Sequence, residues 1–347
     1  MTVGTREATS IVPDMLDEYG GRVRVAMADY LKPREPRRYL YNLVSDYPRR
    51  GGRMLRPCLC LAAARAFGGN DEDALRTAVA IELLHNAFLV HDDVEDESDT
   101  RRGRPTLNAL HGAPVAVNVG DALIFLGMKA LLDNAERLGL PLAMRLLNEA
   151  EHMVRETIEG QSIELGWRKD NAIHLQESDY LHMIMKKTCW YTTIFPVRAG
   201  ALIGARGDLD PDRYIRFGFF AGAAFQIQDD LLNLIGDPAK YGKELDGDIL
   251  EGKRTLMLIH LLEHIGPDER TRLLEVLSRP RSQRRAEDVA WVRERMDAHD
   301  SIGYAQQVAH GLAGAAQNAF DDAFDELPPS RDRTFLRAVV RWVLART

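Results

Sequence analysis

The feature that most constrains this chain is apolar periodicity of the helical kind, which runs through almost all of its 347 residues. The stretch 71–96, for example, predicts a long helix with an apolar stripe made of Ile81, Leu84, Phe88 and Leu89. Alternation of the strand type hardly appears, and no Asn-Gly or Asp-Gly turn joins two strand-like runs. We therefore predict an all-α fold.

Further helices are expected at 57–67, 115–138, 141–166, 177–204, 212–235, 254–264, 284–296, 302–324 and 330–346. No Gly/Ser- or Pro-rich linker separates them, and no internal repeat of solenoid length appears. We therefore predict one domain over residues 1–347, with 1–20 as a loosely ordered N-terminal segment. The most loop-like interior stretch is 279–285, whose arginines are expected to be solvated.

Composition excludes several classes of protein. A net charge of −7 argues against a general nucleic-acid binder, while 45% hydrophobic and 28% charged residues are typical of a soluble globular chain. Cys58, Cys60 and Cys189 form no even-numbered disulfide framework, which favours reduced thiols and a cytoplasmic location. Neither a signal peptide nor a run of roughly 18–20 uninterrupted apolar residues is evident, so no membrane insertion is expected.

The first acidic cluster, HDDVEDESDTRRGRP, begins at His91. Asp92 and Asp96 are four residues apart, which on a helix places them on one face with about 5–6 Å between Cβ atoms. Two like charges at this spacing repel each other, and a divalent cation with oxygen ligands would remove the repulsion. The alternative is an acidic, solvated helix end.

The second acidic cluster, FQIQDDLLN, runs from Phe225 to Asn233. Its polar members share one helical face at spacings of three and four, namely Gln226, Asp229, Asp230 and Asn233. The surrounding residues are apolar, and an acidic pair in a buried helix is costly without a compensating charge. Two such clusters on separate helices predict a shared metal site that faces a diphosphate; the alternative is again a solvated face.

Arginines next to these clusters predict binding of phosphate groups. Arg53 and Arg56 lie in GGRMLRP, where glycines allow close backbone approach and arginine forks match phosphate oxygens. Arg101 and Arg102 directly follow the first acidic cluster. As isolated features, such arginines are typical of a protein surface.

Two further features lie near the predicted site. His85 is seven residues before Asp92 and therefore on the same helical face, where the alternative is a buried core histidine. After the second cluster, the stretch YGKELDGDILEGKRT carries Lys243, Asp248 and Lys253 between glycines. We expect this stretch to place charge over the mouth of a helical pocket.

Together these residues resemble the trans-isoprenyl diphosphate synthase family, the polyprenyl synthetases, along nearly the whole chain. The matching segments are GGRMLRP, DDVED, RRGRPT, Gly160-Gln161, Lys187-Thr188, FQIQDD and GKELDGDILEGK. The resemblance implies an all-α, single-domain helical bundle of the isoprenoid synthase type, with a central cavity and usually homodimeric. It also implies magnesium-dependent condensation of isopentenyl diphosphate with an allylic diphosphate (dimethylallyl, geranyl or farnesyl).

The same resemblance implies roles for individual residues. The ligands of three magnesium ions would be Asp92, Asp96 and Asp229, with Asp93, Asp230 and Asn233 in support. The allylic diphosphate would also contact Arg101, Lys187 and Lys253, and Lys243 would be a further substrate-binding residue. Isopentenyl diphosphate would be bound by Arg53, Arg56, His85 and Arg102. Thr188 and Gln226 would line the region where the allylic cation forms.

Three positions depart from the family pattern. Met54 stands in place of a basic residue and carries no charge, whereas Arg53 replaces a lysine and keeps the charge. Asn233 stands where the second motif ends in aspartate, which predicts weaker metal binding but continued catalysis, because Asp229 supplies the main coordination. Glu164 stands where aspartate is common.

The product length is predicted from the helix that carries Asp92. Side chains one turn before Asp92 would form the floor of the cavity, since helical side chains stack at that interval. Phe88 should block a long tunnel, while Ala87 leaves more depth than two adjacent aromatics would. Because the family pattern relates paired aromatics here to fifteen-carbon products, we favour geranylgeranyl over farnesyl diphosphate. Alternatively, Phe88 packs in the core and other helices set the depth.

The nearest rival function is a class I terpene cyclase, which shares the ionisation chemistry and the helical fold. It would need an Asn/Ser/Glu metal motif in place of the second aspartate cluster, and it would not need an isopentenyl diphosphate site. A non-catalytic helical subunit of a synthase is a third reading, but it should show eroded aspartate clusters or a missing arginine pair. Both clusters and the arginines are present.

Overall fold

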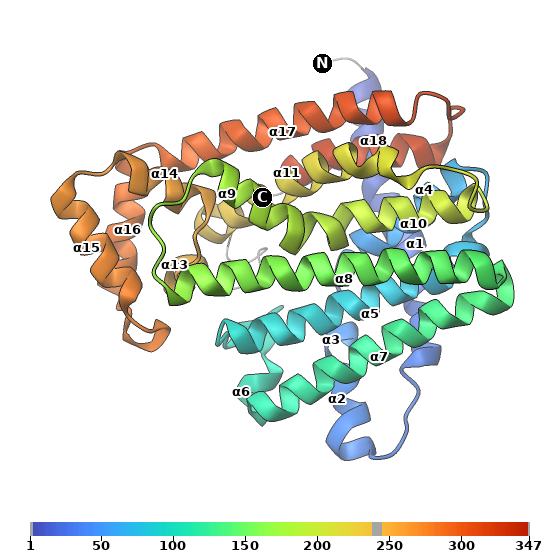
Figure 1. Cartoon of the computed structure of the whole chain (residues 1–347), viewed down its shortest axis with the longest axis horizontal. Helices are drawn as coiled ribbons and strands as arrows, with labels where there is room; N and C mark the ends of the chain where they lie inside the picture. The colour runs from blue at the N-terminus through green and yellow to red at the C-terminus, as the bar shows by residue number, and fades with distance from the viewer. Residues whose placement is uncertain (1–2, 238–244, 346–347) are drawn as a thin grey trace.

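The computed structural model describes residues 3–237 and 245–345, which are almost entirely helical (Figure 1). The first half contains α1 (Val3–Tyr30), η1 (Arg37–Tyr41), α2 (Asn42–Val44), α3 (Asp46–Arg49), α4 (Leu55–Ala66), α5 (Asp71–Glu95), α6 (Leu107–His111), α7 (Ala113–Leu138) and α8 (Leu140–Lys169). The second half contains α9 (Glu177–Ile184), η2 (Met185–Ile194), α10 (Phe195–Gly204), η3 (Pro211–Tyr214), α11 (Ile215–Ile235), α13 (Gly247–Glu251), α14 (Leu256–His264), α15 (Pro267–Ser278), η4 (Arg281–Gln283), α16 (Ala286–Ala298), α17 (Ser301–Ala323) and α18 (Arg331–Leu344). Between α5 and α6, β1 (Thr100–Arg101) pairs antiparallel with β2 (Arg104–Pro105). The predicted all-α class is confirmed.

Helix α5 lies inside the bundle, where it packs against α4 and α7, and α8 crosses the face shown in Figure 1. Burial on α5 extends beyond the predicted apolar stripe, because Glu82, Asn86 and Asp93 are buried as well. Polar and charged side chains that are removed from water in this way need hydrogen-bonding or charged partners inside the protein. The arrangement of the bundle around α5 therefore decides where these charges are neutralised.

The predicted helix at 177–204 is one continuous helical segment, built from α9, η2 and α10. Its middle part, η2, is wound as a π-helix over ten residues and carries Lys187 and Thr188. Winding of this kind is rare and often marks a functional site, because it turns side chains away from the regular α-helical register.

The N-terminal prediction needs correction. Val12, Met15 and Tyr19 of α1 are buried in the core, where α1 packs against α4, α5 and α18. The expected loose order over 1–20 is therefore wrong for these residues, because one face of α1 supplies apolar area to the bundle.

The arginines at 279–285 also differ from expectation, since several of them are engaged rather than solvated. Arg281 lies 3.2 Å from a carboxylate oxygen of Glu251. Arg284 donates to the carbonyl oxygens of Leu250 and Leu277. These contacts attach the loop to α13 and to the C-terminal end of α15.

Helix α7 is the one helix in the described ranges that is long and apolar enough to cross a membrane, by length and composition only. Within the most apolar 18-residue stretch of α7, 44% of the residues are buried inside the protein. Core helices of soluble proteins can be equally long and apolar. The sequence prediction of no membrane insertion stays a prediction.

Two glycines allow helices to approach η2 at backbone distance. A Cβ atom on Gly160 of α8 would lie 2.2 Å from the backbone nitrogen of Lys187. A Cβ atom on Gly222 of α11 would lie 2.9 Å from the Cα atom of Cys189. The glycine of the Gly160-Gln161 pair is therefore explained by packing, because any larger residue would push α8 away from η2.

We predict that Gly160→Ala destabilises the protein, whereas Gly166→Ala on the same helix does not. The first change overpacks the contact with η2 and should lower the free energy of unfolding by about 1–3 kcal/mol. A Cβ atom on Gly166 would meet nothing within 4 Å, so the second change should gain the helix propensity of alanine, about 0.5–1 kcal/mol. Urea denaturation of both variants measures the difference, and equal effects would contradict the packing argument.

Candidate active site

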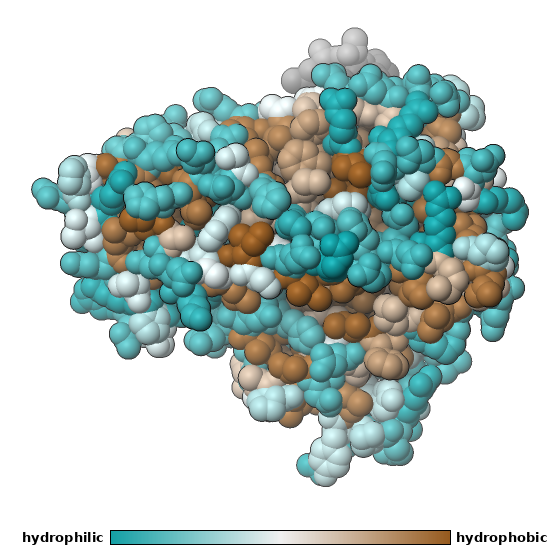
Figure 2. Space-filling view, viewed as in Figure 1, coloured by the Kyte–Doolittle hydropathy of each residue, from teal (hydrophilic) through white to brown (hydrophobic). Residues whose placement is uncertain are grey.

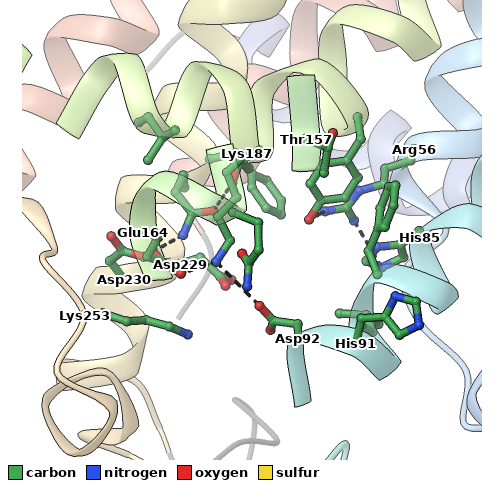
Figure 3. Close-up of a pocket in the computed structure, with 18 of the residues that line it drawn as sticks. Arg56, His85, His91, Asp92, Thr157, Glu164, Lys187, Asp229, Asp230 and Lys253 are labelled. Atoms are coloured by element: carbon green, nitrogen blue, oxygen red, sulfur yellow. Dashed lines mark hydrogen bonds and ion pairs between the residues drawn. The ribbon is translucent and has the colours of Figure 1, made fainter. Parts of the chain in front are cut away.

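A cavity of about 470 Å³ opens between α4, α5, α8, η2 and α11 (Figure 3). Carboxylates and amines line one part of it, a second group of cations lines another part, and apolar side chains lie between them. Figure 3 shows Asp92 and Asp229 entering the same region from α5 and α11, with Lys187 and Lys253 nearby.

Asp92 faces the cavity, as predicted, whereas Asp96 does not. Helix α5 ends at Glu95, and Asp96 is its C-cap residue with only 1% of its surface exposed. Its carboxylate lies 2.7 Å from the Lys253 amine and also accepts from Arg168. Burial by itself would raise the pKa of Asp96, but Lys253 and the other nearby cations outweigh it and hold the pKa below its ordinary value. Asp96 is therefore paired with Lys253 and Arg168 in this structure, and its shared metal site with Asp92 stays a prediction.

Asp93 is completely buried and lies outside the cavity lining. One carboxylate oxygen accepts from Arg101 Nε at 2.9 Å, and the other accepts from the Tyr47 hydroxyl. Arg101 also lies 3.3 Å from Asp92, so it joins the two aspartates. Asp93 thus holds Arg101 at the edge of the cavity, and its supporting role for a metal stays a prediction.

In the second cluster, Asp229 and Asp230 both line the cavity, and Asp230 is buried. Asp230 accepts from the Tyr180 hydroxyl at 2.7 Å and from Gln226 Nε2 at 2.6 Å. The Thr188 hydroxyl in turn donates to Gln226 Oε1 at 2.9 Å. The predicted pair of Thr188 and Gln226 is therefore part of one hydrogen-bonded chain that ends on Asp230.

Asn233 has a structural contact that the sequence does not predict. Its side-chain oxygen accepts the backbone N–H of Asp248 at 3.0 Å, and its backbone oxygen accepts from the N–H of Asp246 at 2.8 Å. The oxygen expected to support a metal thus holds the start of α13, and the ligand role of Asn233 stays a prediction.

Two lysines carry the positive charge on the acidic side of the cavity. Lys187 contacts Glu164 and lies 3.5 Å from Asp92, and these carboxylates outweigh burial and raise its pKa. Lys253 lies 2.7 Å from both Asp96 and Glu251, and its pKa is likewise raised despite burial. Both amines are therefore charged and lie in the cavity lining.

The second group of cations comes from GGRMLRP and from the strand pair after α5. The cavity lining includes Arg53, Arg56, His85 and Arg102. Arg56 is held from several sides, since it donates to the Tyr191 hydroxyl at 3.1 Å and to Thr192 at 3.0 Å, and lies 3.4 Å from His85 Nε2. The sequence prediction brings these four residues to one place correctly. Met54 is buried and also belongs to the cavity lining, where it brings no charge.

Between the two groups of cations the wall is apolar. It contains Phe88, Leu89, Ile124, Met183, Ile184 and Phe225. The Phe88 ring meets the Tyr191 ring edge-on, with 5.6 Å between centroids. Ala87 is completely buried in the core and lies outside the cavity lining, so of the two residues named for chain length only Phe88 is on the wall.

Sequence reasoning missed several residues of the site. Arg168, Tyr180, Tyr191 and Trp342 all contact predicted site residues from other elements. Tyr191 is three residues after Thr188 and could have been found from that motif, but the others carry no local signal. Lys243 lies outside the described residues.

Magnesium fits the donors that face the cavity. Asp92 and Asp229 offer carboxylate oxygens, the ligands this ion prefers. Among residues 3–237 and 245–345, no three Asp, Glu, His or Cys side chains are gathered so that they could hold a metal by themselves. Magnesium typically binds through one or two carboxylates together with water and substrate phosphates. The carboxylates therefore suit a metal that arrives with a phosphorylated substrate.

The fold and the site together describe an all-α protein whose cavity is lined by carboxylates, cations and an apolar wall. A family model described as "Polyprenyl synthetase" matches residues 37–296. The chain is 31% identical to a short chain isoprenyl diphosphate synthase of Methanothermobacter thermautotrophicus, over 96% of both chains. It is 31% identical to the octaprenyl diphosphate synthase of Escherichia coli, over 77% of this chain and 78% of that one.

Solved structures agree with this assignment. A geranylgeranyl pyrophosphate synthetase from Pyrococcus horikoshii has a TM-score of 0.83 and 29% identity, with 99% of both chains covered. A geranylgeranyl pyrophosphate synthase from Corynebacterium glutamicum, complexed with isoprenyl diphosphate and magnesium, has a TM-score of 0.81 and 26% identity, over 98% of this chain and 99% of that one. The chain belongs to the polyprenyl synthetase family and is a prenyltransferase.

Burial raises the pKa of Asp230 to about 6, although the hydrogen bonds from Tyr180 and Gln226 act to lower this pKa. Since the pKa in the folded protein lies above the ordinary value of about 3.9, the folded state favours the protonated carboxyl. This contribution to stability is complete below pH 4 and is lost as the pH rises through about 6.

We therefore predict that Asp230→Asn stabilises the metal-free protein at pH 7, by about 1–2 kcal/mol in the free energy of unfolding, although it lowers activity. Thermal or urea denaturation in the presence of a chelator measures the effect. The control is the same variant near pH 4, where the gain should vanish because Asp230 is already protonated. A variant less stable than the parent at both pH values would contradict the argument.

Proposed function

We propose that this prenyltransferase joins isopentenyl diphosphate to an allylic diphosphate, with magnesium as cofactor, and releases geranylgeranyl diphosphate. The observation that carries the proposal is the presence of two separate groups of cations around one cavity. Lys187, Lys253 and Arg101 form the first group, and Arg53, Arg56 and Arg102 form the second. Two diphosphates require two such groups, because each brings its own negative charge.

The first group would stabilise the diphosphate that leaves the allylic substrate. Departure of this diphosphate separates charge, so positive side chains placed beforehand lower the barrier. Magnesium, held by Asp92 and Asp229, would supply further positive charge to the leaving group. Thr188 and Gln226 orient each other by a hydrogen bond and would present oxygen atoms toward the allylic carbon that becomes positive.

The second group would hold isopentenyl diphosphate so that its double bond faces the allylic carbon. Such positioning removes much of the entropic cost of bringing two substrates together. After the new carbon–carbon bond forms, one proton must leave, and the released diphosphate can accept it. No side chain of the protein is required as a nucleophile.

We propose the twenty-carbon product because Phe88 narrows the apolar wall. Its edge-on contact with Tyr191 joins α5 to η2 across the cavity, which would limit how far a growing chain extends. The names of the relatives span short-chain and octaprenyl products, so the length rests on this contact. Farnesyl diphosphate is the alternative product.

The second group of cations also favours condensation over a terpene cyclase reaction, which ionises a single diphosphate. Incubation of the purified protein with magnesium, labelled isopentenyl diphosphate and each allylic primer tests the proposal, followed by chromatography of the dephosphorylated products. We expect a twenty-carbon alcohol. A hydrocarbon formed without isopentenyl diphosphate would show a cyclase, and no diphosphate release would show a non-catalytic subunit.

Substitution of Phe88 tests the limit on length. Phe88→Ala should shift the main product by at least one five-carbon unit, because the change opens the wall where Phe88 meets Tyr191. Phe219→Ala is the matched control, since Phe219 is half-buried on α11 and lies outside the cavity lining. An unchanged product distribution for Phe88→Ala would assign the limit to other residues.

We further propose that the enzyme works as a cytoplasmic homodimer. Apolar side chains are exposed on α7 and α8, namely Val117, Phe125, Leu132, Leu140, Met144 and Ile158. Figure 2 shows brown atoms over the part of this face where α7 lies. An exposed apolar surface of this kind is typical of a contact between two copies of a chain.

Phe125→Glu should convert this dimer to a monomer, because it places charge at the most exposed of these residues, with 80% of its surface accessible. Size-exclusion chromatography with light scattering measures the mass of each species. Val25→Glu on α1, where the exposed fraction is 76%, is the control and should leave the mass unchanged. A monomeric parent protein would overturn the proposal.

A further inference from the structure

The two terminal helices lie outside the region matched by the family model, which covers residues 37–296. Nevertheless, both helices contact the GGRMLRP segment. From α1, Arg24 donates to the carbonyl oxygen of Gly52 at 3.2 Å. From α18, the ring of Trp342 lies under the Arg53 guanidinium, 5.1 Å from ring centroid to Cζ. The segment that carries the second group of cations is therefore braced from both ends of the chain.

The side chain of Trp342 contributes to the cavity lining as well as to the packing of α18. It is half-buried and belongs to the cavity lining, although it is on the last helix of the chain. The neighbouring Val339 and Val343 are buried and anchor this part of α18. Because the helix backbone is fixed in this way, the indole ring forms a rigid surface in the cavity lining.

Arg53 needs such a surface more than its neighbours do. Arg56 has hydrogen-bonding partners in Tyr191 and Thr192, and Arg102 donates to the carbonyl oxygen of Gly51, but Arg53 is exposed and follows two glycines. A long side chain in this setting loses considerable conformational freedom when it binds a ligand. A ring beneath the guanidinium restricts that freedom beforehand.

We propose that Trp342 is a positioning residue for isopentenyl diphosphate, which acts by holding Arg53 in the orientation that binds the diphosphate. The planar guanidinium of arginine stacks on an aromatic face, whereas the compact ammonium group of lysine offers no flat surface for stacking. Trp342 and Arg53 thus form one unit. This inference rests on the proposed function and adds a residue from the C-terminal helix to the substrate site.

The test compares Trp342→Leu with the parent protein in steady-state assays. Loss of a cation–π contact at an exposed site should raise the KM for isopentenyl diphosphate by about two- to fivefold. The kcat and the KM for the allylic primer should stay unchanged, because Trp342 does not contact the first group of cations. Trp342→Phe should restore most of the affinity, since it keeps an aromatic face.

Trp291→Leu is the matched control. Trp291 of α16 stacks with Arg272 at 4.3 Å in the same manner, but it lies outside the cavity lining. This variant should lose a comparable contact without any change in the KM for isopentenyl diphosphate. If both variants raised the KM for isopentenyl diphosphate equally, the effect would be a general one on folding and the proposal would be overturned.

A double-mutant cycle with Arg53→Lys separates positioning from packing. In the lysine background, Trp342→Leu should have a smaller effect on affinity, because lysine keeps the charge but offers no flat group to stack on the ring. Calorimetric titration with isopentenyl diphosphate in the absence of an allylic primer gives the same comparison without catalysis. Additive effects of the two changes would contradict the proposal.

The outcomes also separate this inference from the proposed function. If the parent protein neither transfers prenyl groups nor binds isopentenyl diphosphate, the proposed function fails. If the parent protein is active and Trp342→Leu has the parent's KM, only the role of Trp342 fails. Should Trp342→Leu fold poorly by circular dichroism, Trp342→Met takes its place in the assays and in the cycle, because it keeps an apolar side chain and removes the aromatic face.

Discussion

Carboxylates buried inside a helical bundle need positive charge beside them, and most contacts around the cavity answer this requirement. Asp93 pairs with Arg101, Asp96 pairs with Lys253 and Arg168, and Glu164 pairs with Lys187. Removing one partner of such a pair leaves an uncompensated buried charge, which is strongly destabilising. In each pair the two residues come from different elements, so charge neutralisation also fixes the elements relative to one another. Asp92 and Asp229 remain directed at the cavity.

The site also requires that helix backbones approach one another closely, and this approach occurs at η2. Gly160 and Gly222 bring α8 and α11 against η2, and the π-helical winding then presents Lys187, Thr188 and Tyr191 to the cavity. The amine reaches the acidic side, while the tyrosine hydroxyl reaches Arg56 on the other side. One short segment thus contacts both groups of cations, which suits a reaction that joins two diphosphate substrates.

Prediction from sequence succeeded where the signal is local. Helical periodicity gave most of the long helices to within a few residues, with α1 as the exception. The spacing of acidic and basic residues pointed to Asp92, Asp229, Arg53 and Arg56 as residues of one site, and the family resemblance added Lys187. It failed where a role depends on a partner far along the chain. Arg168 and Tyr180 stand in stretches without a motif, and only the packing of α8 and α9 brings them to Asp96 and Asp230.

By itself the sequence determined the all-α class, the two acidic clusters and the family, because periodicity and motif spacing are properties of the chain alone. The tertiary structure decided which members of each cluster face the cavity. Asp96 turns to Lys253 because α5 ends one residue earlier, and Asn233 turns to the backbone of Asp248 because α13 begins there. Trp342 joins the site because α18 packs back against α4. Side-chain direction depends on helix ends and neighbouring elements, and these exist only after the chain has folded.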